Sequence, residues 1–450
     1  MVGEAFRDLP GLALLESARP GRNARWSFLT ADPVTVIDEP SAGSEPLAAA
    51  RATLARLAAE RPVGDDGVIP PFLGGLVGYL SYDLGRRIER LPTLAVADQD
   101  LPLLRLALHD WVLAWDRRDG RAWLGGRALD GDAMRLARRL AEVRTRLRDI
   151  AVGQAAPPRD VDVRAAIRMR SGLSRAAYEA GVEVVRAAIA RGEIYQANLT
   201  RRLDAPFEAD PWPLYRRLRA GDPALFSAYL DLGADATTGA PRAIVSASPE
   251  PFLAVDRHGF VTTDPIKGTR PRGRTRAEDR ALACELLGSV KDRAENVMIV
   301  DVLRNDLGRT CQPGSIRVPR LCRLERTEAV QHLVTTITGH LAPGRDQLDV
   351  LAASFPGGSI TGAPKIRAME ILEALEPVRR GPYTGAAGWI SPDGAMRTSI
   401  LIRTFVADGR RLTLHVGGGI TWGSHPAAEW EETVAKAAGP LRAIGAMEVE

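Results

Sequence analysis

Short apolar runs joined by tight turns are the feature that most constrains the fold. Strand-like runs occur at 243–248, 260–263, 396–406 and 411–416, and neighbouring runs are joined by turns as often as by helical segments. Parallel strands need a long crossover between them, whereas antiparallel strands accept a short turn. The sequence therefore predicts an α+β fold with antiparallel sheets rather than a doubly wound sheet.

Periodic apolar residues predict two helices on either side of a linker. From Leu136 to Ile150 they recur at alternating four- and three-residue steps, which is typical of an amphipathic helix over 131–150. A second helix begins near Ser174 and stops at Gly192, and capping-box patterns at Thr275–Glu278 and Ser289–Asp292 predict two further helix starts. The segment 151–160 has no such period and contains a Pro pair, so it is the predicted linker.

Length and linker position give the domain prediction. At 450 residues the chain is too long for one small core. We expect an N-terminal region over 1–155 and a C-terminal region over 160–450, with the two regions sharing one core.

Composition disfavours several classes of protein. The net charge is only +4, with Arg interleaved with Asp and Glu, so we expect no nucleic-acid partner; that alternative would require a steeply salt-dependent DNA affinity. The three cysteines form no CxxC pair, which favours reduced thiols. With neither an apolar run of 18 residues nor a signal-type N-terminus, we expect no membrane partner and a cytoplasmic location.

Lysine is rare in this chain, and one lysine lies in "DPIKGTRPRG" (264–273). Of the 60 basic residues only four are lysine: Lys267, Lys291, Lys365 and Lys436. Arg stays protonated, whereas a desolvated Lys can lose its proton and act as a nucleophile. Lys267 is therefore a candidate nucleophile, although four lysines could also fall at these positions by chance.

A hairpin is predicted to bring a carboxylate to this lysine. "DRHG" (256–259) is typical of a turn between two apolar runs. Pairing in register about that turn places Lys267 opposite Ser248 and Glu250 opposite Pro265, at the same open end of the hairpin. Glu250 and Lys267 could then be an acid and a nucleophile, or equally a surface ion pair of little energetic value.

Two predicted helices each carry a pair of acidic side chains. Asp292 and Glu295 share one helix face, and Glu429, Glu432 and Lys436 share another after Pro426. Oxygen donors from two helices suit Mg²⁺ better than zinc. The alternative is an ordinary solvated charged face.

Further candidates lie near the C-terminal end. Arg403 falls within an apolar strand-like run, where a buried guanidinium needs an anionic partner, either a protein carboxylate or a ligand carboxylate. Gly417, Gly418 and Gly419 end another run and would let backbone amides approach an anion, or simply make a tight bend. "FPGGSITGAPK" (355–365) lacks the GxxxxGK spacing of a phosphate loop, which disfavours a nucleoside triphosphatase.

Taken in order, these segments resemble the chorismate-utilising enzyme family, which includes the first components of aminodeoxychorismate and anthranilate synthases and the isochorismate and salicylate synthases. The resemblance covers about 174–437, with "PFLGGLVGYLSYDLGRRIERLP" (71–92) extending it. The stretches that carry it are "GEIYQANLTRR", "SASPEPF", "PIKGTRPRG", "RAENVMIVDVLRNDLGR", "QHLVTTITG", "FPGGSITGAPKIRAMEILEALEP", "GPYTGAAGWI", "TSILIRT" and "GGGI…E..ET..KA".

The resemblance implies a fold and a set of site residues. The fold would be that of anthranilate synthase component I, with antiparallel sheets forming a sandwich-like core and helices packed outside. Mg²⁺ would be held by Glu295 and Glu432, with Glu429 and Asp292 in outer roles, and would bridge to the ring carboxylate of chorismate. By the same resemblance, Glu250 is the general acid and His332 lies near the reacting ring. The remaining substrate-binding positions are Arg403, Tyr383, Thr361, Gly268, Thr269, Gly417, Gly418, Gly419, Gln196 and Lys436.

Two positions distinguish the branches of the family. Water-adding relatives carry lysine where this chain has Gln196, which disfavours hydration to isochorismate. The anthranilate branch typically reads PIAGT, the aminodeoxychorismate branch reads PIKGT, and this chain reads PIKGT with Lys267. The resemblance thus implies conversion of chorismate and ammonia to 4-amino-4-deoxychorismate through a covalent Lys267 intermediate, on the route to 4-aminobenzoate and folate.

The same resemblance implies partners. No cysteine lies in a G-x-C-x-G elbow, so ammonia is expected from a separate glutamine amidotransferase subunit, and aromatisation from a separate aminodeoxychorismate lyase. "LLES" at Leu14–Ser17 matches a tryptophan-pocket signature of the anthranilate branch, so Leu15, Glu16 and Ser17 are a candidate tryptophan site, with an ordinary chain connection as the alternative. Anthranilate synthase component I and a non-catalytic, tryptophan-binding regulatory protein remain the alternative functions.

Overall fold

The computed structural model describes residues 2–19, 24–41, 43, 45–60, 69–151, 167–327 and 330–449. The predicted linker, 151–160, lies outside these residues except for Ala151. Within the described ranges the strands form two large sheets, and no helix there is long and apolar enough to cross a bilayer.

The first sheet has twelve strands, all paired antiparallel except β22 with β8. In spatial order they are β22 (Ala446–Val449), β8 (Ile167–Ser171), β9 (Gln196–Pro206), β21 (Arg411–Ile420), β20 (Thr404–Asp408), β11 (Pro241–Ser248), β10 (Phe226–Ala234), β1 (Ala13–Glu16), β2 (Trp26–Thr30), β6 (Trp111–Asp116) and β7 (Arg121–Gly126), with β17 (Gly362–Ala363) on β9.

The second sheet has ten strands, all antiparallel. Their order is β14 (Ile266–Pro271), β16 (Val330–His340), β13 (Phe260–Thr263), β12 (Pro251–Val255), β19 (Met396–Ile400), β18 (Ala386–Ile390), β4 (Gly75–Leu80), β5 (Leu104–His109) and β3 (Thr35–Ile37), with β15 (Arg317–Arg326) on β16.

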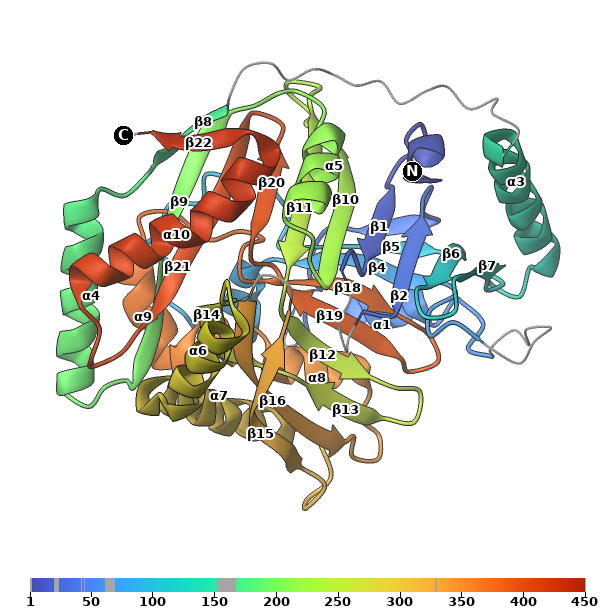
Figure 1. The fold of residues 1–450 in the computed structure, drawn as a ribbon. Helices are drawn as coiled ribbons and strands as arrows, with labels where there is room; N and C mark the ends of the chain where they lie inside the picture. The colour runs from blue at the N-terminus through green and yellow to red at the C-terminus, as the bar shows by residue number, and fades with distance from the viewer. Residues whose placement is uncertain are drawn as a thin grey trace.

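Helices cover the outer faces of both sheets (Figure 1). They are α1 (Ala48–Leu54), α2 (Gly85–Ile88), α3 (Ala133–Ala151), α4 (Arg175–Ala190), α5 (Trp212–Gly221), α6 (Arg276–Gly288), α7 (Val290–Gly308), α8 (Gln347–Ser354), α9 (Lys365–Leu375) and α10 (Pro426–Ile444), with short 3-10 turns η1 (Val2–Phe6), η2 (Tyr82–Leu84) and η3 (Gly358–Ile360).

The apolar core is layered as a sandwich requires. One cluster joins Phe28 of β2 to Tyr79 of β4 and Trp389 of β18, so it lies between the two sheets. A second lies under α5 and α10 on the first sheet, and a third under α7 and α8 on the second. The predicted α+β sandwich with outer helices is confirmed.

The two predicted regions contribute to both sheets. β1, β2, β6 and β7 join the first sheet beside strands from after residue 160, and β3, β4 and β5 join the second sheet in the same way. The boundary at 155–160 itself stays a prediction.

Local helix signals are found where the sequence placed them. The hydroxyls of Ser174, Thr275 and Ser289 accept backbone N–H groups at the starts of α4, α6 and α7. The helix predicted over 131–150 is α3, and α4 ends at Ala190, just before Gly192 in the left-handed region.

The register predicted for the hairpin is wrong by one residue. Val255 pairs with Val261, and Asp256 N donates to Phe260 O, which leaves a three-residue loop at 257–259. The loop forms because the Asp256 side chain accepts from the backbone of His258 and Phe260 and Gly259 adopts a left-handed φ of 79°. The β12–β13 pairing also ends at Thr262. Lys267 therefore does not face Ser248; β14 leaves β12 and pairs with β16 instead.

The single strand predicted over 396–406 is two strands in different sheets. β19 belongs to the second sheet and β20 to the first, and Ile400–Thr404 carries the chain across. Arg403 lies in this crossing with a left-handed φ of 49°, and its side chain is 39% exposed. The prediction that Arg403 lies inside an apolar strand is therefore wrong.

Candidate active site

Lys267 lies at a β-bulge that turns the strand toward α7. In the β14–β16 pairing, Lys267 faces Leu333 and Thr269 faces His332, so Gly268 is the extra residue. Gly268 has a φ of 74°, and a Cβ there would lie only 2.9 Å from the Cβ of Asp292 on α7. Glycine is thus required both by the backbone conformation and by the close approach of the helix.

Lys267 and Glu250 influence each other's protonation, although they do not meet through the predicted register. Lys267 Nζ donates to the carbonyl oxygen of Ser359 at 2.9 Å. Burial lowers the pKa of Lys267 below its ordinary value, opposed by the nearby charges of Glu250 and Glu295. Burial raises the pKa of Glu250, opposed by Lys267 and by a hydrogen bond with Ser359.

The direction of each shift matters for the chemistry. A lowered pKa increases the neutral fraction of the lysine amine, and a raised pKa increases the protonated fraction of the carboxyl group. A neutral amine beside a protonated carboxylic acid is the pairing that a nucleophile and a general acid need.

Gly418 opens a space between two carboxylates of α10. A Cβ at Gly418 would lie 3.2 Å from Glu429 Oε2 and 3.5 Å from Glu432 Oε1. Glu429 is buried, and burial raises its pKa, opposed by a hydrogen bond with Ser424. Burial would also raise the pKa of Glu432, but Lys436, 2.7 Å away, reverses the shift and lowers it.

Helix α7 contributes a third carboxylate to the same region. Burial raises the pKa of Glu295, opposed first by Lys267 and then by Lys291, whose Nζ lies 4.0 Å from Glu295 Oε1. Lys291 and Lys267 also lower the pKa of Glu432, so α7, α10 and β14 converge here. Asp292 instead pairs with Arg270 at 3.1 Å.

The carboxylates fit a magnesium ion only if the substrate completes the site. Among the described residues no three His, Cys, Asp or Glu side chains converge closely enough to hold a metal ion. Glu429 and Glu432 do leave a space bounded by two hard oxygen atoms at Gly418. Mg²⁺ is usually bound through one or two carboxylates together with substrate oxygens and water, so this donor set is compatible with it.

The three glycines lie inside a strand rather than at its end, which corrects the prediction. Gly417, Gly418 and Gly419 pair with Thr200, Leu199 and Asn198 on β9. The absence of side chains gives room: a Cβ at Gly419 would lie 2.1 Å from Gln196 Nε2. Gln196 is buried, and its Oε1 has no hydrogen-bond partner among the residues that the structure describes.

Lys436 links α10 to β21, which contains Gly417–Gly419 and is called the glycine strand below. Its Nζ donates to the carbonyl oxygen of Gly417 at 2.9 Å while it pairs with Glu432. Thr361 is fully buried behind β9, where its carbonyl oxygen accepts from Asn198 N at 2.9 Å.

Arg403 and Tyr383 contact residues other than Lys267 and Glu250. No hydrogen bond or ion pair within the described ranges joins either residue to Lys267 or Glu250, and Arg403 Nη1 lies 3.7 Å from Asp222 Oδ1. Tyr383 is buried and stacks on His415 at 4.9 Å, and burial raises the pKa of its phenol.

His332 lies on β16, beside the strand that carries Lys267. It faces Thr269 across β14 and β16, and burial, with Arg19 and Arg403 nearby, lowers its pKa to about 4. His332 is therefore neutral near pH 7.

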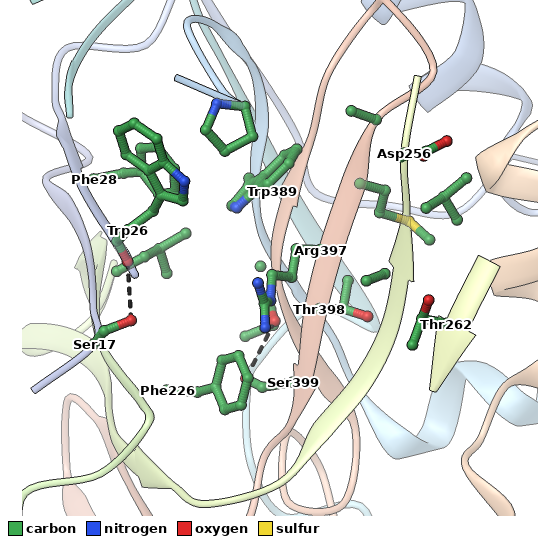
Figure 2. Close-up of a pocket in the computed structure, with 18 of the residues that line it drawn as sticks. Ser17, Trp26, Phe28, Phe226, Asp256, Thr262, Trp389, Arg397, Thr398 and Ser399 are labelled. Carbon is green, nitrogen blue, oxygen red and sulfur yellow. Dashed lines mark hydrogen bonds between the residues drawn. The ribbon is translucent and has the colours of Figure 1, made fainter. Parts of the chain in front are cut away.

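A separate cavity of about 470 Å³ adjoins the predicted tryptophan residues. Figure 2 shows Trp26, Phe28 and Trp389 on one side of it, with Phe226 and Arg397 facing them. Leu15, Glu16 and Ser17 line it. Ser17 Oγ already donates to Trp26 O at 3.0 Å, and Glu16 accepts from Tyr215 and Arg219. Arg397 lies over the Phe226 ring at 5.3 Å.

Two residues of the site were missed in the sequence analysis. Ser359 contacts both Lys267 and Glu250, and Ser424 contacts Glu429. Ser359 lies in the glycine-rich stretch 355–365, and Ser424 lies just before the helix that carries Glu429 and Glu432. Their nearness in sequence to these candidate residues could have identified both serines.

Comparison with known proteins assigns the chain to a family. The model of chorismate binding enzymes matches residues 13–442. Aminodeoxychorismate synthase component 1 of Salmonella typhimurium is 42% identical over 366 residues, covering 81% of this chain and 76% of that protein. Anthranilate synthase component 1 of Mycobacterium tuberculosis is 38% identical over 469 residues, covering 99% and 90%.

A solved structure agrees with these matches. Anthranilate synthase component I from Streptococcus pneumoniae superposes with a TM-score of 0.79 at 28% identity, covering 94% of this chain and 93% of that one. With the sandwich and its carboxylate-lined site, these matches place the chain in the chorismate binding enzyme family, as a chorismate-utilising enzyme.

Proposed function

We propose that the chain is the first component of an aminodeoxychorismate synthase, forming 4-amino-4-deoxychorismate from chorismate and ammonia. The observation that carries the proposal is Lys267: an amine with a lowered pKa, held near a carboxyl group with a raised pKa. An alanine at this position, as in the anthranilate branch, would offer no nucleophile.

The proposed reaction has two displacements. The neutral Lys267 amine attacks C2 of chorismate, the ring double bond shifts, and the C4 hydroxyl leaves as water with the proton of Glu250. The new secondary ammonium returns a proton to Glu250. Ammonia then attacks C4, the double bond shifts back, and the lysine nitrogen leaves as the neutral amine with the proton of Glu250, which the new C4 ammonium then replaces. The sum is chorismate plus ammonia giving aminodeoxychorismate plus water.

We infer that Glu295 and Glu432, with Glu429 nearby, would hold Mg²⁺ when the substrate is bound. When bound, the ion would supply positive charge that neutralises the ring carboxylate of the substrate. Lys436 and Lys291 both lower the pKa of Glu432, which favours the ionised form of that carboxyl group. Arg403 and Tyr383 would bind the enolpyruvyl carboxylate, and neutral His332 would lie beside the ring.

Ammonia would come from a separate glutamine amidotransferase subunit, and a separate lyase would aromatise the product to 4-aminobenzoate. The printed name "component 1" of the Salmonella relative supports a second component. Gln196, with its unpartnered Oε1, offers ammonia an acceptor where water-adding relatives carry lysine.

Anthranilate synthase component I is the second candidate. The longer match to the Mycobacterium protein favours it, as does the "LLES" stretch at the cavity of Figure 2. Products separate the two: with chorismate, Mg²⁺ and ammonium, our proposal expects 4-aminobenzoate only after a lyase is added. Direct appearance of fluorescent anthranilate would refute it.

Intact-mass analysis tests the covalent step. Wild type incubated with chorismate without ammonia is expected to gain the mass of chorismate minus water, and Lys267→Ala is expected to gain nothing. An adduct that persists in Lys267→Ala would contradict the mechanism. Chorismate consumption by the wild type would also exclude a non-catalytic tryptophan-binding protein.

A further inference from the structure

A buried ion pair behind the proposed site contacts three of its segments at once. Arg380 is 2% exposed, and Glu376, just past the end of α9, is also buried. The guanidinium donates through Nε to Glu376 Oε2 at 2.8 Å and through Nη2 to Glu376 Oε1 at 2.6 Å. This is the bidentate arrangement that fixes both side chains in one geometry.

The remaining N–H groups of Arg380 donate to three segments around the proposed site, namely the 359–361 loop, strand β9 and the segment of Tyr383 and Thr384. Nη1 donates to Ile360 O at 3.0 Å, next to the Ser359 carbonyl that accepts from Lys267. Nη2 donates to Asn198 O at 2.6 Å, in the residue of β9 that faces Gly419. Nη1 also lies 3.3 Å from Thr384 Oγ1, beside Tyr383. All five N–H groups are thus used.

Glu376 extends the same network. Its Oε1 accepts from the backbone N and the hydroxyl of Thr200, at 3.1 Å and 2.9 Å, where Thr200 faces Gly417. Tyr82 packs against the guanidinium at 4.6 Å. Burial disfavours the charge of Arg380, but Glu376 and the other partners reverse this and raise its pKa, so the arginine remains a cation.

Stability alone is a weak reason for such a pair. Desolvating two charges costs about as much as their attraction returns, and apolar replacements of buried pairs are often neutral or stabilising. A planar guanidinium, by contrast, can hold five acceptors in fixed directions, which neither lysine nor an apolar residue can do.

We propose that Arg380, fixed by Glu376, is a positioning residue. Its hydrogen bonds hold the 359–361 loop at Ile360, strand β9 at Asn198 and the Tyr383 segment at Thr384 in one arrangement. Because β9 pairs with the glycine strand, this arrangement sets where the Lys267 amine and the substrate side of the site lie. The inference rests on the proposed site but not on which product the enzyme makes.

The chain offers a matched control pair. Arg86 pairs with Glu373 of α9 and with Asp83, and both Arg86 and Glu373 are largely buried. The other contacts of this pair are to Pro92, Leu94 and Ala95, outside the three site segments. The link between this pair and the site is Asp83, whose Oδ2 accepts from Gly381 N at 2.9 Å. Arg86→Lys therefore perturbs a buried arginine–glutamate pair of the same kind, and the Arg86 guanidinium itself is not hydrogen-bonded to any of the three site segments within the described ranges.

The experiment compares Arg380→Lys with Arg86→Lys in the full-length protein. Both are expected to lower the Tm, whereas only Arg380→Lys lowers kcat for chorismate consumption, by about 30-fold or more, with KM within about threefold. A second readout is the rate at which an acylating reagent labels Lys267, measured by mass spectrometry without substrate. It should change at least fivefold in Arg380→Lys and less than twofold in Arg86→Lys.

Each possible result either supports or overturns the positioning role of Arg380. Equal losses of kcat in the two variants, or an unchanged kcat in folded Arg380→Lys, would overturn it. If Arg380→Lys does not fold, Glu376→Gln removes one charge but keeps an oxygen for Thr200, and a kcat loss of about fivefold with altered Lys267 labelling is expected; wild-type values in both assays would refute the positioning role. Because labelling needs no chorismate, it tests Arg380 even if wild type fails to consume chorismate, which would refute the proposed function instead.

Discussion

Replacing Glu250 by glutamine tests the proposed general acid directly. Glutamine keeps the size of the side chain, and the backbone at 250 is held by Ser248 Oγ at 3.3 Å and by Ile400 N at 3.1 Å, which the change leaves intact. General acid catalysis contributes about 10²–10⁴-fold. The variant is therefore expected to lose about 2.7–5.4 kcal/mol of transition-state stabilisation, at about 1.36 kcal/mol per tenfold.

The pH dependence of stability gives an independent check. Burial raises the folded-state pKa of Glu250, so the native chain binds this proton more tightly than the unfolded chain does. Glu250 therefore lowers the free energy of unfolding as pH rises from about 4.3, the ordinary value, through the raised pKa. Glu250→Gln is expected to match the wild type below that window and to be the more stable protein above it.

The assay is chorismate consumption with saturating ammonium and Mg²⁺, alongside urea unfolding at several pH values. Glu373→Gln is the matched control, because Glu373 is a buried carboxylate whose hydrogen-bond partners in the described part of the chain are Arg86 and the backbone N–H groups of Leu94 and Ala95. It is expected to lose stability but keep turnover, the reverse of Glu250→Gln. Turnover by folded Glu250→Gln within threefold of the wild type would refute the reasoning.

Three further predictions concern other parts of the molecule. Gly418→Ala would place a methyl group 3.2 Å from Glu429 Oε2, and we expect about tenfold more Mg²⁺ to be needed for half-maximal turnover, measured by titration with the metal; an unchanged requirement would refute this metal site. Arg201→Met removes a buried guanidinium that pairs with Glu448 of β22 and lies 4.3 Å from the Trp430 ring, so urea unfolding should show a loss of about 2 kcal/mol and hydrogen exchange should show faster opening of β22. L-Tryptophan at 100 times its Kd should stabilise the wild type by about 2.7 kcal/mol, and Arg397→Gln, which alters the cavity of Figure 2, should reduce the shift; no shift in the wild type would refute tryptophan binding.

The features that could be predicted from the sequence are those that depend on residues only a few positions apart. The caps at Ser174, Thr275 and Ser289 depend on hydroxyls and backbone a few residues apart, so a pattern suffices to find them. The same holds for Glu429 and Glu432, which share a face of α10 because helical spacing requires it.

The features that could not be predicted from the sequence depend on pairing between strands that are distant along the chain. β14 pairs with β16, more than 60 residues further along the chain, rather than continuing the hairpin. The 396–406 run divides because the chain changes sheets at Ile400–Thr404. An apolar pattern is the same on either side of such a crossing, so periodicity carries no signal for it.

The predicted register of the hairpin was wrong, yet Lys267 and Glu250 do lie near each other in the structure. Glu250 starts the run into β12, which pairs with β13 and β19, whereas Lys267 is carried by β14 on β16. β13 also pairs with β16, so one strand holds both the hairpin and the lysine. The two residues are therefore close because both strands depend on β16, and the bulge at Gly268 sets the direction of the lysine. The nucleophile and the acid thus become a pair only when the second sheet is complete, which makes the pKa shifts of both groups a property of the folded sheet rather than of "DPIKGTRPRG" alone.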